Sequence, residues 1–383
     1  MRLYEEQFLW LLRAGLWGKE ESPFPMIAPC YIDWSSLLSL AKRQTTLLLV
    51  QDGLELLLEG QKARGEERVA VPPRALLKVQ NMRMQTQKVH NDLNQLILEL
   101  DGLLRSVGIL PLLLKGESMA SLYLCPESRN CGDIDLFVFP EDYTRAARLL
   151  ATCLEQIEMA TEKHGTFRRG RYNVELHFCP LVLQRPWLRH YFDLYTREKL
   201  SDVHETVSLP FAEGKVLVPP VTYNAIFLLA HIYHHFIEGG IGLRQICDWT
   251  LFLDRNFERL DVDELATKLE QFGLMNAWKV FVSLAVGFLG LKRDRAPFYD
   301  ADEHYARKAK EILTIILKEG NFGRYGKGEL AKKKDDSYST KKSKSFKLGL
   351  QRLKCRIPIF PLDTLLFFPK WASESLFRLF KKR

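Results

Sequence analysis

The stretch "LLLKGESMASLYLCPESRNCGDIDLFVF", residues 112–139, contains the main candidate site and the strand-like run around which the predicted core is built. Asp133 and Asp135 come directly before the apolar run "LFVF", so two like charges enter a segment that is otherwise typical of a buried strand. Residues i and i+2 of a strand point to the same face, about 7 Å apart. We therefore expect the two carboxylates to project together, with Ile134 packed on the opposite face.

Two carboxylates on one face repel each other unless a positive charge neutralises them, and hard divalent cations do this well. Acid-x-acid triplets also arise by chance, as in "LDVDELATKL" and "YDADEHYARK" elsewhere in the chain. Those two triplets stand where helices begin, and acids there complement the helix N-terminus without any metal. Only Asp133 and Asp135 continue into a strand-like run, which favours a metal site at this pair.

Three neighbouring features strengthen this hypothesis. In "LLLKGES" an apolar run is followed by Gly116 and a helix start, and such a turn lets the backbone N–H groups approach a phosphate. Lys115 places a cation beside that turn. The run "YNVELHF", residues 172–178, predicts a strand with Glu175 and His177 on one face. A third carboxylate on a neighbouring strand would complete a set of three acids.

The order of segments along the chain predicts an α+β fold, in which a small mixed sheet with helices is flanked by helical segments. Residues 1–73 have leucines at helical spacing, and residues 74–219 form the mixed core, which starts with a long helix. Residues 220–317 are helical again, and residues 318–383 form a basic tail. The sequence therefore predicts four parts with these bounds.

Three local signals subdivide the mixed core. The long helix is expected to end near Gly108. Pro140 should end the strand after Asp133, and residues 141–157, "EDYTRAARLLATCLEQI", are expected to form a helix with acids in its first turn. Residues 203–218 fit a pair of strands with Gly214 at the turn.

The positive charge of the chain is concentrated in the tail. The chain has a formal net charge of +8, whereas residues 318–383 contain 18 Lys and Arg against 6 Asp and Glu. The rest of the chain is therefore mildly acidic, which argues against a nucleic-acid surface across the whole body. RNA or an anionic membrane stays open as a partner of the tail alone.

The tail itself has two kinds of sequence. Residues 327–345, "KGELAKKKDDSYSTKKSKS", are poor in hydrophobic side chains and are expected to form a mobile linker. Residues 357–383 are apolar with basic ends and could dock on the body or lie on an anionic membrane. The prolines in this second part interrupt any long amphipathic helix, which favours docking.

The sequence also restricts the cellular setting. No stretch approaches the roughly 18 uncharged apolar residues of a membrane span, and the N-terminus is typical of an amphipathic helix rather than a secretory signal. Seven scattered cysteines without a CxxC pair argue against a disulfide framework or a zinc ribbon. We expect a cytoplasmic protein without a transmembrane segment, and the tail leaves a location peripheral to the membrane open.

The blocks described above resemble the nucleotidyltransferase superfamily that includes polymerase-beta-like and antibiotic-modifying enzymes. The shared pattern is a glycine turn, a downstream Asp-x-Asp strand and a third acid on a later strand. With "VELHF" and "HIYHHFIEGGIGLRQICDW", the chain is similar over residues 75–290 to uncharacterised bacterial nucleotidyltransferases of the NTP-transferase-5 type. The resemblance implies an enzyme that moves a nucleoside monophosphate from an NTP such as ATP to an acceptor hydroxyl.

By this resemblance Asp133 and Asp135 would bind the catalytic metals, Mg²⁺ or Mn²⁺. Glu175 would be the third acid, which binds metal or orients the acceptor hydroxyl. The residues implied in nucleotide binding are Lys115, Gly116, Ser118 and Arg129. The chain departs from the superfamily at Glu117, because Ser or Gly usually follows the glycine directly and Ser118 comes one position later.

A histidine-rich segment lies downstream of the acids. His231, His234 and His235 stand at i, i+3 and i+4, a spacing that can place them on one helix face. A zinc site would need a further ligand that the spacing does not supply, so histidines packed between helices or in contact with substrate are the alternatives. Arg244 and Asp248 are four residues apart and are expected to form an intrahelical ion pair. The candidates for substrate contact are His164, His177, His231, His234 and Arg244.

The acceptor stays open at this level. A small hydroxylated molecule, a sugar, a protein side chain or an RNA end would suit the same core. The alternative is a non-catalytic module that binds a nucleotide or a partner and associates with a membrane or RNA through its basic tail. The presence of three acids favours catalysis, because a binding module would not need all three.

Overall fold

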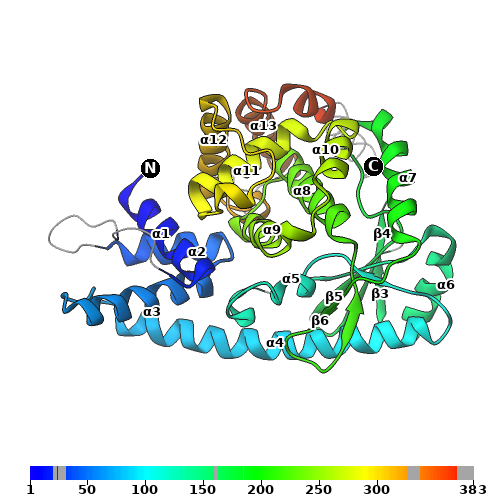
Figure 1. Ribbon diagram of the computed structural model, residues 1–383, viewed down its shortest axis with the longest axis horizontal. Coiled ribbons are helices and arrows are strands. Elements are labelled where there is room, and N and C mark those ends of the chain that lie inside the picture. Colours follow the sequence, from blue (N-terminus) through cyan, green and yellow to red (C-terminus); the bar gives the residue numbers. More distant parts are fainter. Residues whose placement is uncertain are drawn as a thin grey trace.

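The computed structural model of the chain is an α+β structure in which a small mixed sheet lies beside a larger body of helices (Figure 1). This arrangement confirms the fold class expected from the order of helical and strand-like segments. The structure describes residues 1–19, 24, 32–130, 132–158, 163–183, 185–326 and 337–368. Within these ranges, we find no helix with both the length and the apolar character needed to span a bilayer.

Five strands form the sheet in the order β1-β2-β5-β4-β3. Their bounds are β1 Leu112–Leu113, β2 Ile134–Phe137, β3 Glu155–Glu158, β4 His164–Arg169 and β5 Tyr172–His177. β2 and β5 are parallel neighbours, and their register places Asp135 opposite Glu175. The other neighbouring strands pair antiparallel. β2, which contains Asp135 and directly follows Asp133, is thus an interior strand beside the strand that carries the third acid.

The helix after β2 is shorter than the sequence predicts. α6 (Pro140–Leu150) starts at the proline that ends the preceding strand segment, as expected. The expectation that this helix continues to Ile157 is wrong, because Glu155–Glu158 is the edge strand β3. Ladder hydrogen bonds from β3 to β4 satisfy its backbone in the extended form, and this tertiary pairing outweighs the local helix propensity.

The long helix α4 (Pro73–Arg105) runs along one side of the whole molecule (Figure 1). The apolar side chains of its second half, from Leu93 to Leu104, are buried against the sheet and α6. Its first half lies beside the N-terminal helices, where it contacts α3 (Leu47–Arg64). α4 therefore connects the N-terminal helices to the sheet.

The N-terminal helices pack unusually closely because of two glycines. α1 (Leu3–Trp17) and α3 cross where Gly15 and Gly53 face the opposite backbone. A Cβ at Gly15 would lie 2.0 Å from the Leu49 carbonyl oxygen, and a Cβ at Gly53 would lie 1.9 Å from that of Leu11. α2 (Trp34–Arg43) packs on the same pair.

Further helices complete the fold after the sheet. They are α5 Glu117–Ala120, α7 Arg189–Leu200, α8 Val221–Glu238, α9 Leu243–Asn256, α10 Val262–Gln271, α11 Met275–Leu289, α12 Glu303–Glu319 and α13 Tyr338–Arg356. The hairpin consists of β6 Thr206–Ser208 and β7 Lys215–Leu217, with Gly214 next to the turn as expected. Single-turn 3₁₀ helices are η1 Pro126–Ser128, η2 Pro186–Leu188, η3 Phe257–Arg259, η4 Arg293–Arg295 and η5 Asn321–Gly323.

The described residues form two hydrophobic cores. One lies between the sheet, the second half of α4, and α6. The other contains helices from both ends of the chain, and the Trp17 indole donates a hydrogen bond to the Leu289 carbonyl oxygen at 2.6 Å. The division into four parts stays a prediction, although the N-terminal and C-terminal helices share this second core.

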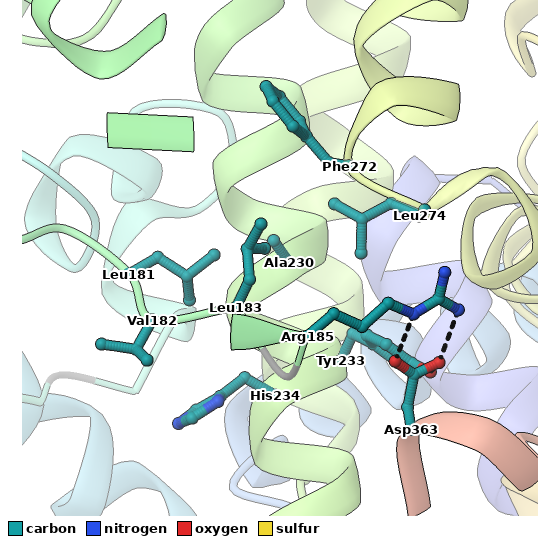
Figure 2. A pocket seen from close by; sticks show the side chains of 11 residues that line it. Leu181, Val182, Leu183, Arg185, Ala230, Tyr233, His234, Phe272, Leu274 and Asp363 are labelled. Atoms are coloured by element: carbon teal, nitrogen blue, oxygen red, sulfur yellow. Dashed lines mark hydrogen bonds and ion pairs between the residues drawn. The ribbon is translucent and has the colours of Figure 1, made fainter. Parts of the chain in front are cut away.

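The described part of the tail docks on the helical body, as the prolines favoured. Ile359 and Phe360 are buried in the larger core. Asp363 accepts hydrogen bonds from Nε and Nη2 of Arg185 at 2.8 and 3.0 Å, and from the Tyr233 hydroxyl at 2.8 Å (Figure 2). The buried Arg356 donates to the Phe236 carbonyl oxygen at 2.6 Å. Residues 369–383, which belong to the same predicted segment, lie outside the described residues.

The linker predicted over residues 327–345 is only partly tested. Residues 327–336 lie outside the described residues. Residues 338–345 are helical, so the linker expectation is wrong there. The Ser337 side chain accepts a hydrogen bond from the Thr340 backbone N–H at 3.2 Å and caps α13, whose later residues line grooves against α8 and α12.

Candidate functional site

A cavity of about 400 Å³ lies between the sheet, the loop after β1, helices α8 and α9, and the turn after α12. Ten of the twelve residues predicted for the site line it: Lys115, Gly116, Arg129, Asp133, Asp135, His164, Glu175, His177, His231 and Arg244. Ser118 and His234 are not among the lining residues. The folded chain thus brings together side chains that are more than 100 positions apart.

Two adjacent parallel strands deliver the acids. Asp135 on β2 lies opposite Glu175 on β5, and Asp133 stands one residue before β2 begins. Ile134 is buried in the sheet core on the other face, as the alternation predicts. The three carboxylates therefore meet at one wall of the cavity.

Asp135 is the most tightly held of the three acids. Its side chain is 2% exposed, and one carboxylate oxygen forms an ion pair with the Lys115 ammonium. The other oxygen lies 3.1 Å from Nε2 of His177. Burial alone would raise the pKa of Asp135, but Lys115 and His177 outweigh this effect and hold the pKa well below its usual value. Asp135 is therefore an anion at neutral pH.

Asp133 differs, because it has no described partner. Among the residues that the structure describes, none forms a hydrogen bond or an ion pair with its carboxylate. The pKa of Asp133 is raised by partial burial in the cavity wall and then by repulsion from Asp135 and Glu175. Lys115 and Arg244 act in the opposite direction, but they do not outweigh the burial and the repulsion at Asp133.

Two imidazoles complete a cluster around Glu175. Nε2 of His177 lies 3.2 Å from a Glu175 oxygen, and Nε2 of His164 lies 3.8 Å from the same oxygen. Ligand atoms of these three residues all lie within 4.8 Å of one another. Burial alone would lower the pKa of His177, but its hydrogen bonds to Asp135 and Glu175 raise it. Burial lowers the pKa of His164.

The donor set fits a divalent cation. Carboxylates suit Mg²⁺ and Mn²⁺, while imidazoles favour transition metals such as Mn²⁺ and Zn²⁺ over Mg²⁺. Asp133, whose carboxylate has no hydrogen-bond or ion-pair partner among the described residues, supports this fit. A cation beside it would relieve the repulsion among the three acids. The sequence indicated His164 and His177 only as candidates for substrate contact. In the structure, their ring nitrogens lie close enough to the Glu175 carboxylate for all three residues to bind one metal ion.

The glycine turn before α5 packs closely against the backbone of Asp133. Gly116 has φ +72°, and a Cβ there would lie 3.1 Å from the Asp133 carbonyl oxygen. The turn therefore requires glycine for its backbone conformation. The helix that follows it, α5, has only four residues.

Glu117, the position that departs from the superfamily pattern, has a structural role. Its buried carboxylate lies 2.7 Å from Nδ1 of His90 and accepts a hydrogen bond from Nδ2 of Asn94 at 2.7 Å. Nε2 of the same histidine lies 2.9 Å from the Arg129 carbonyl oxygen. This network fixes the loop after β1 to α4. Ser118 is buried beside it, and its hydroxyl has no hydrogen-bond partner among the described residues.

Arg129 is committed to an ion pair with α9. Its Nε and Nη2 donate to the two carboxylate oxygens of Asp248, both at 2.9 Å, and the Tyr123 hydroxyl donates to the same carboxylate at 2.6 Å. The expected pair between Arg244 and Asp248 is therefore wrong. Asp248 turns toward the buried Arg129, and Nη1 of Arg244 donates to the Asn130 carbonyl oxygen at 2.6 Å.

The histidines of α8 divide between two places. His231 and His235 line the cavity, with ring centroids 4.4 Å apart. Burial lowers the pKa of both, well below the usual range for His231 and to about 3 for His235, so both are neutral at pH 7. The two histidines therefore contribute neutral polar surface to the cavity and no positive charge.

His234 does not line the cavity. Its Nε2 lies 3.0 Å from the Lys163 ammonium and 3.1 Å from a Glu238 carboxylate oxygen. It borders a separate pocket of about 10 Å³ beside Arg185 and Asp363 (Figure 2), which has no room for a substrate. Among the described residues, the cluster with metal-ligand spacing is the one around Glu175, so the zinc alternative on α8 gains no support.

Sequence reasoning missed one wall of the cavity. Lys163, Gln245, Asn321, Phe322 and Arg324 also line it. The last three lie in the turn after α12, which the sequence assigned to the tail. The glycines of "GNFGRYG" signal a tight turn there, but no local pattern indicates that this turn faces the acids.

These features define an α+β protein with a cavity between its sheet and its helices, where three carboxylates and two imidazoles meet at one wall. A family model described as uncharacterised nucleotidyltransferase matches residues 31–290, and the chain belongs to this family. The match confirms the family resemblance and extends it toward the N-terminus. No curated protein and no solved structure matches the chain. The turn after α12 lies beyond the matched residues.

Proposed function

We propose that the chain is a metal-dependent nucleotidyltransferase that moves a nucleoside monophosphate from an NTP to an acceptor hydroxyl in this cavity. Membership of the family supports the transfer chemistry. The observation that carries the proposal is the register of β2 and β5, which sets Asp135 opposite Glu175 with Asp133 close by. Polymerase-like transfer needs such a group of carboxylates around its metal ions.

In this proposal Asp133, Asp135 and Glu175 hold the divalent cation, with His164 and His177 as additional ligands. When bound, the cation would neutralise the charge that develops on the transferred phosphate and the departing pyrophosphate. The acceptor oxygen forms a bond to the α-phosphorus, the bond to pyrophosphate breaks, and the hydroxyl proton passes to a carboxylate. Glu175 suits this last role because its side chain stays partly accessible from the cavity.

Lys115 would change partners when the triphosphate binds. Its ammonium is now paired with Asp135 at the cavity wall. A cation on the acids would compete for that carboxylate, and the released ammonium would then neutralise phosphate oxygens. Gly116 would support the same phosphates only through its backbone, because it has no side chain.

A second candidate function also has an observation in its favour. The Lys115 ammonium already neutralises Asp135, as a metal ion would. A non-catalytic module that binds a nucleotide or partner without metal would keep this pair intact. Such a module predicts nucleotide binding that is indifferent to divalent cations and is lost in Lys115→Ala.

Transfer of label from two forms of ATP tests the proposed reaction. The protein is incubated with Mn²⁺, a cell extract and ATP labelled at either the α- or the γ-phosphate. We expect the α-label to appear in an acceptor and the γ-label to leave as pyrophosphate. Asp133→Asn/Asp135→Asn should abolish the transfer. Transfer of the γ-label that requires the added protein, or α-label transfer above the extract background that the double variant retains, would contradict nucleotidyl transfer.

A further inference from the structure

The turn after α12 holds an aromatic residue in an unfavourable backbone conformation. Phe322, in η5, has φ +53° and ψ +27°, the left-handed region that non-glycine residues other than Asn and Asp rarely adopt. Its side chain is nevertheless 43% exposed. Because so much of the ring is exposed, its packing alone does not account for a phenylalanine at a strained backbone position.

Close backbone contacts hold this turn in place. A Cβ at Gly323 would lie 2.2 Å from the Gly239 carbonyl oxygen, and a Cβ at Gly240 would lie 2.8 Å from the Gly323 nitrogen. Nε2 of Gln245 donates a hydrogen bond to the Asn321 side-chain oxygen at 3.2 Å. The glycines after α8 therefore let the turn lie directly against the start of α9, which fixes the position of Phe322.

Phe322 lies on the same cavity as the three acids. Among the described residues that line it, Phe322 is the only Phe, Tyr or Trp. Its ring centroid lies 6.0 Å from that of His235, in an edge-to-face arrangement. The Arg324 guanidinium carbon lies over the Phe322 ring, 5.5 Å from its centroid. A partly exposed aromatic ring with a cation over one face can stack a flat base on its other face.

We propose that Phe322 is the stacking platform for the nucleobase of the NTP, with Arg324 on the opposite face of the ring. This inference rests on the proposed function and names the part of the site that binds the base, as the acids and Lys115 serve the phosphates. Stacking is tolerant of base identity, because every base presents a π-face. The site should therefore bind purine and pyrimidine triphosphates with graded affinities.

Calorimetry with two probes separates the base from the phosphates. ATP and inorganic tripolyphosphate are titrated with Mn²⁺ into wild type, Phe322→Asn and Phe322→Trp. We expect Phe322→Asn to weaken ATP binding by roughly 5- to 150-fold, the range for loss of one base–aromatic stack. Binding of tripolyphosphate should stay within about twofold, and Phe322→Trp should retain ATP binding.

Asparagine is chosen because it tolerates left-handed backbone angles, so the variant should unfold at the wild-type temperature or above it. The matched control is Phe346→Asn on α13, a ring of similar exposure that does not line the cavity. The affinity of Phe346→Asn for ATP should not change.

Unchanged ATP affinity in Phe322→Asn would overturn the inference. So would equal loss of both probes together with a lower unfolding temperature, which would show a structural role. A wild-type protein that binds neither probe would overturn the proposed function and this inference together.

Discussion

At the scale of single residues, the charges around the cavity divide into compensated and uncompensated groups. Arg129 and Asp248 are both buried and satisfy each other through two hydrogen bonds, so they act as a structural pair. Asp133 has no such partner among the described residues, and its pKa is raised by burial and by its acidic neighbours. An ion pair of the first kind stabilises a fold, whereas an uncompensated acid is typical of a ligand site.

Asp248→Asn tests the structural pair. The change keeps the side-chain size but leaves the Arg129 guanidinium buried without its counter-ion. We expect a loss of about 3–5 kcal/mol in the free energy of unfolding, measured by urea denaturation. The control Asp263→Asn, at an exposed helix start, should change it by less than about 0.5 kcal/mol. Equal losses of unfolding free energy in the two variants would show that the stability of the protein does not depend on the buried pair of Arg129 and Asp248.

At the scale of elements, the sequence predicts those whose signals are local. The long helix that ends near Gly108 and the strands around Asp135 and Glu175 appear as expected because periodicity and turn residues specify them. β3 was predicted as helix because its pairing with β4 is not visible in its own sequence. The first part of α13, residues 338–345, was missed because a lysine-rich, polar stretch resembles a linker until its packing is known.

Two helical glycines test how closely elements pack. Gly53→Ala should destabilise the protein by about 1–3 kcal/mol or more, because the added methyl group meets the α1 backbone and the helices must separate. Gly102→Ala is the matched control on α4, since nothing lies within 4 Å of its Cβ position. Alanine there should stabilise the protein by about 0.5–1 kcal/mol. Both values come from thermal or urea unfolding. A neutral Gly53→Ala would contradict the close crossing of α1 and α3.

At the scale of the whole molecule, the site is assembled from distant parts of the chain. The acids come from one segment that the sequence identifies at once. The wall formed by Asn321, Phe322 and Arg324 could not be predicted, because it depends on contacts between the turn after α12 and the start of α9. The pairing of Arg129 with Asp248 depends in the same way on a contact across 119 positions.

Docking of the tail is a property of this whole assembly. Asp363→Ala removes the carboxylate that accepts hydrogen bonds from Arg185 and Tyr233. We expect it to cost about 1–3 kcal/mol of unfolding free energy, the range for hydrogen bonds to a charged group. The control Glu66→Ala, which breaks an exposed ion pair with Arg64 outside the first turn of any helix, should have no measurable effect. Indifference of the protein to Asp363→Ala would mean that the tail does not depend on this contact.

In the proposed function, the three acids hold a cation that binds the nucleotide. We would measure ATP binding by calorimetry, with and without Mg²⁺ or Mn²⁺, on wild type and on Asp133→Asn/Asp135→Asn. The control Asp261→Asn/Asp263→Asn makes the same charge change at a helix start, where asparagine still caps. We predict binding that requires the metal, is lost in the first double variant and is kept in the control. Binding that ignores both the metal and the loss of Asp133 and Asp135 would contradict the proposed function.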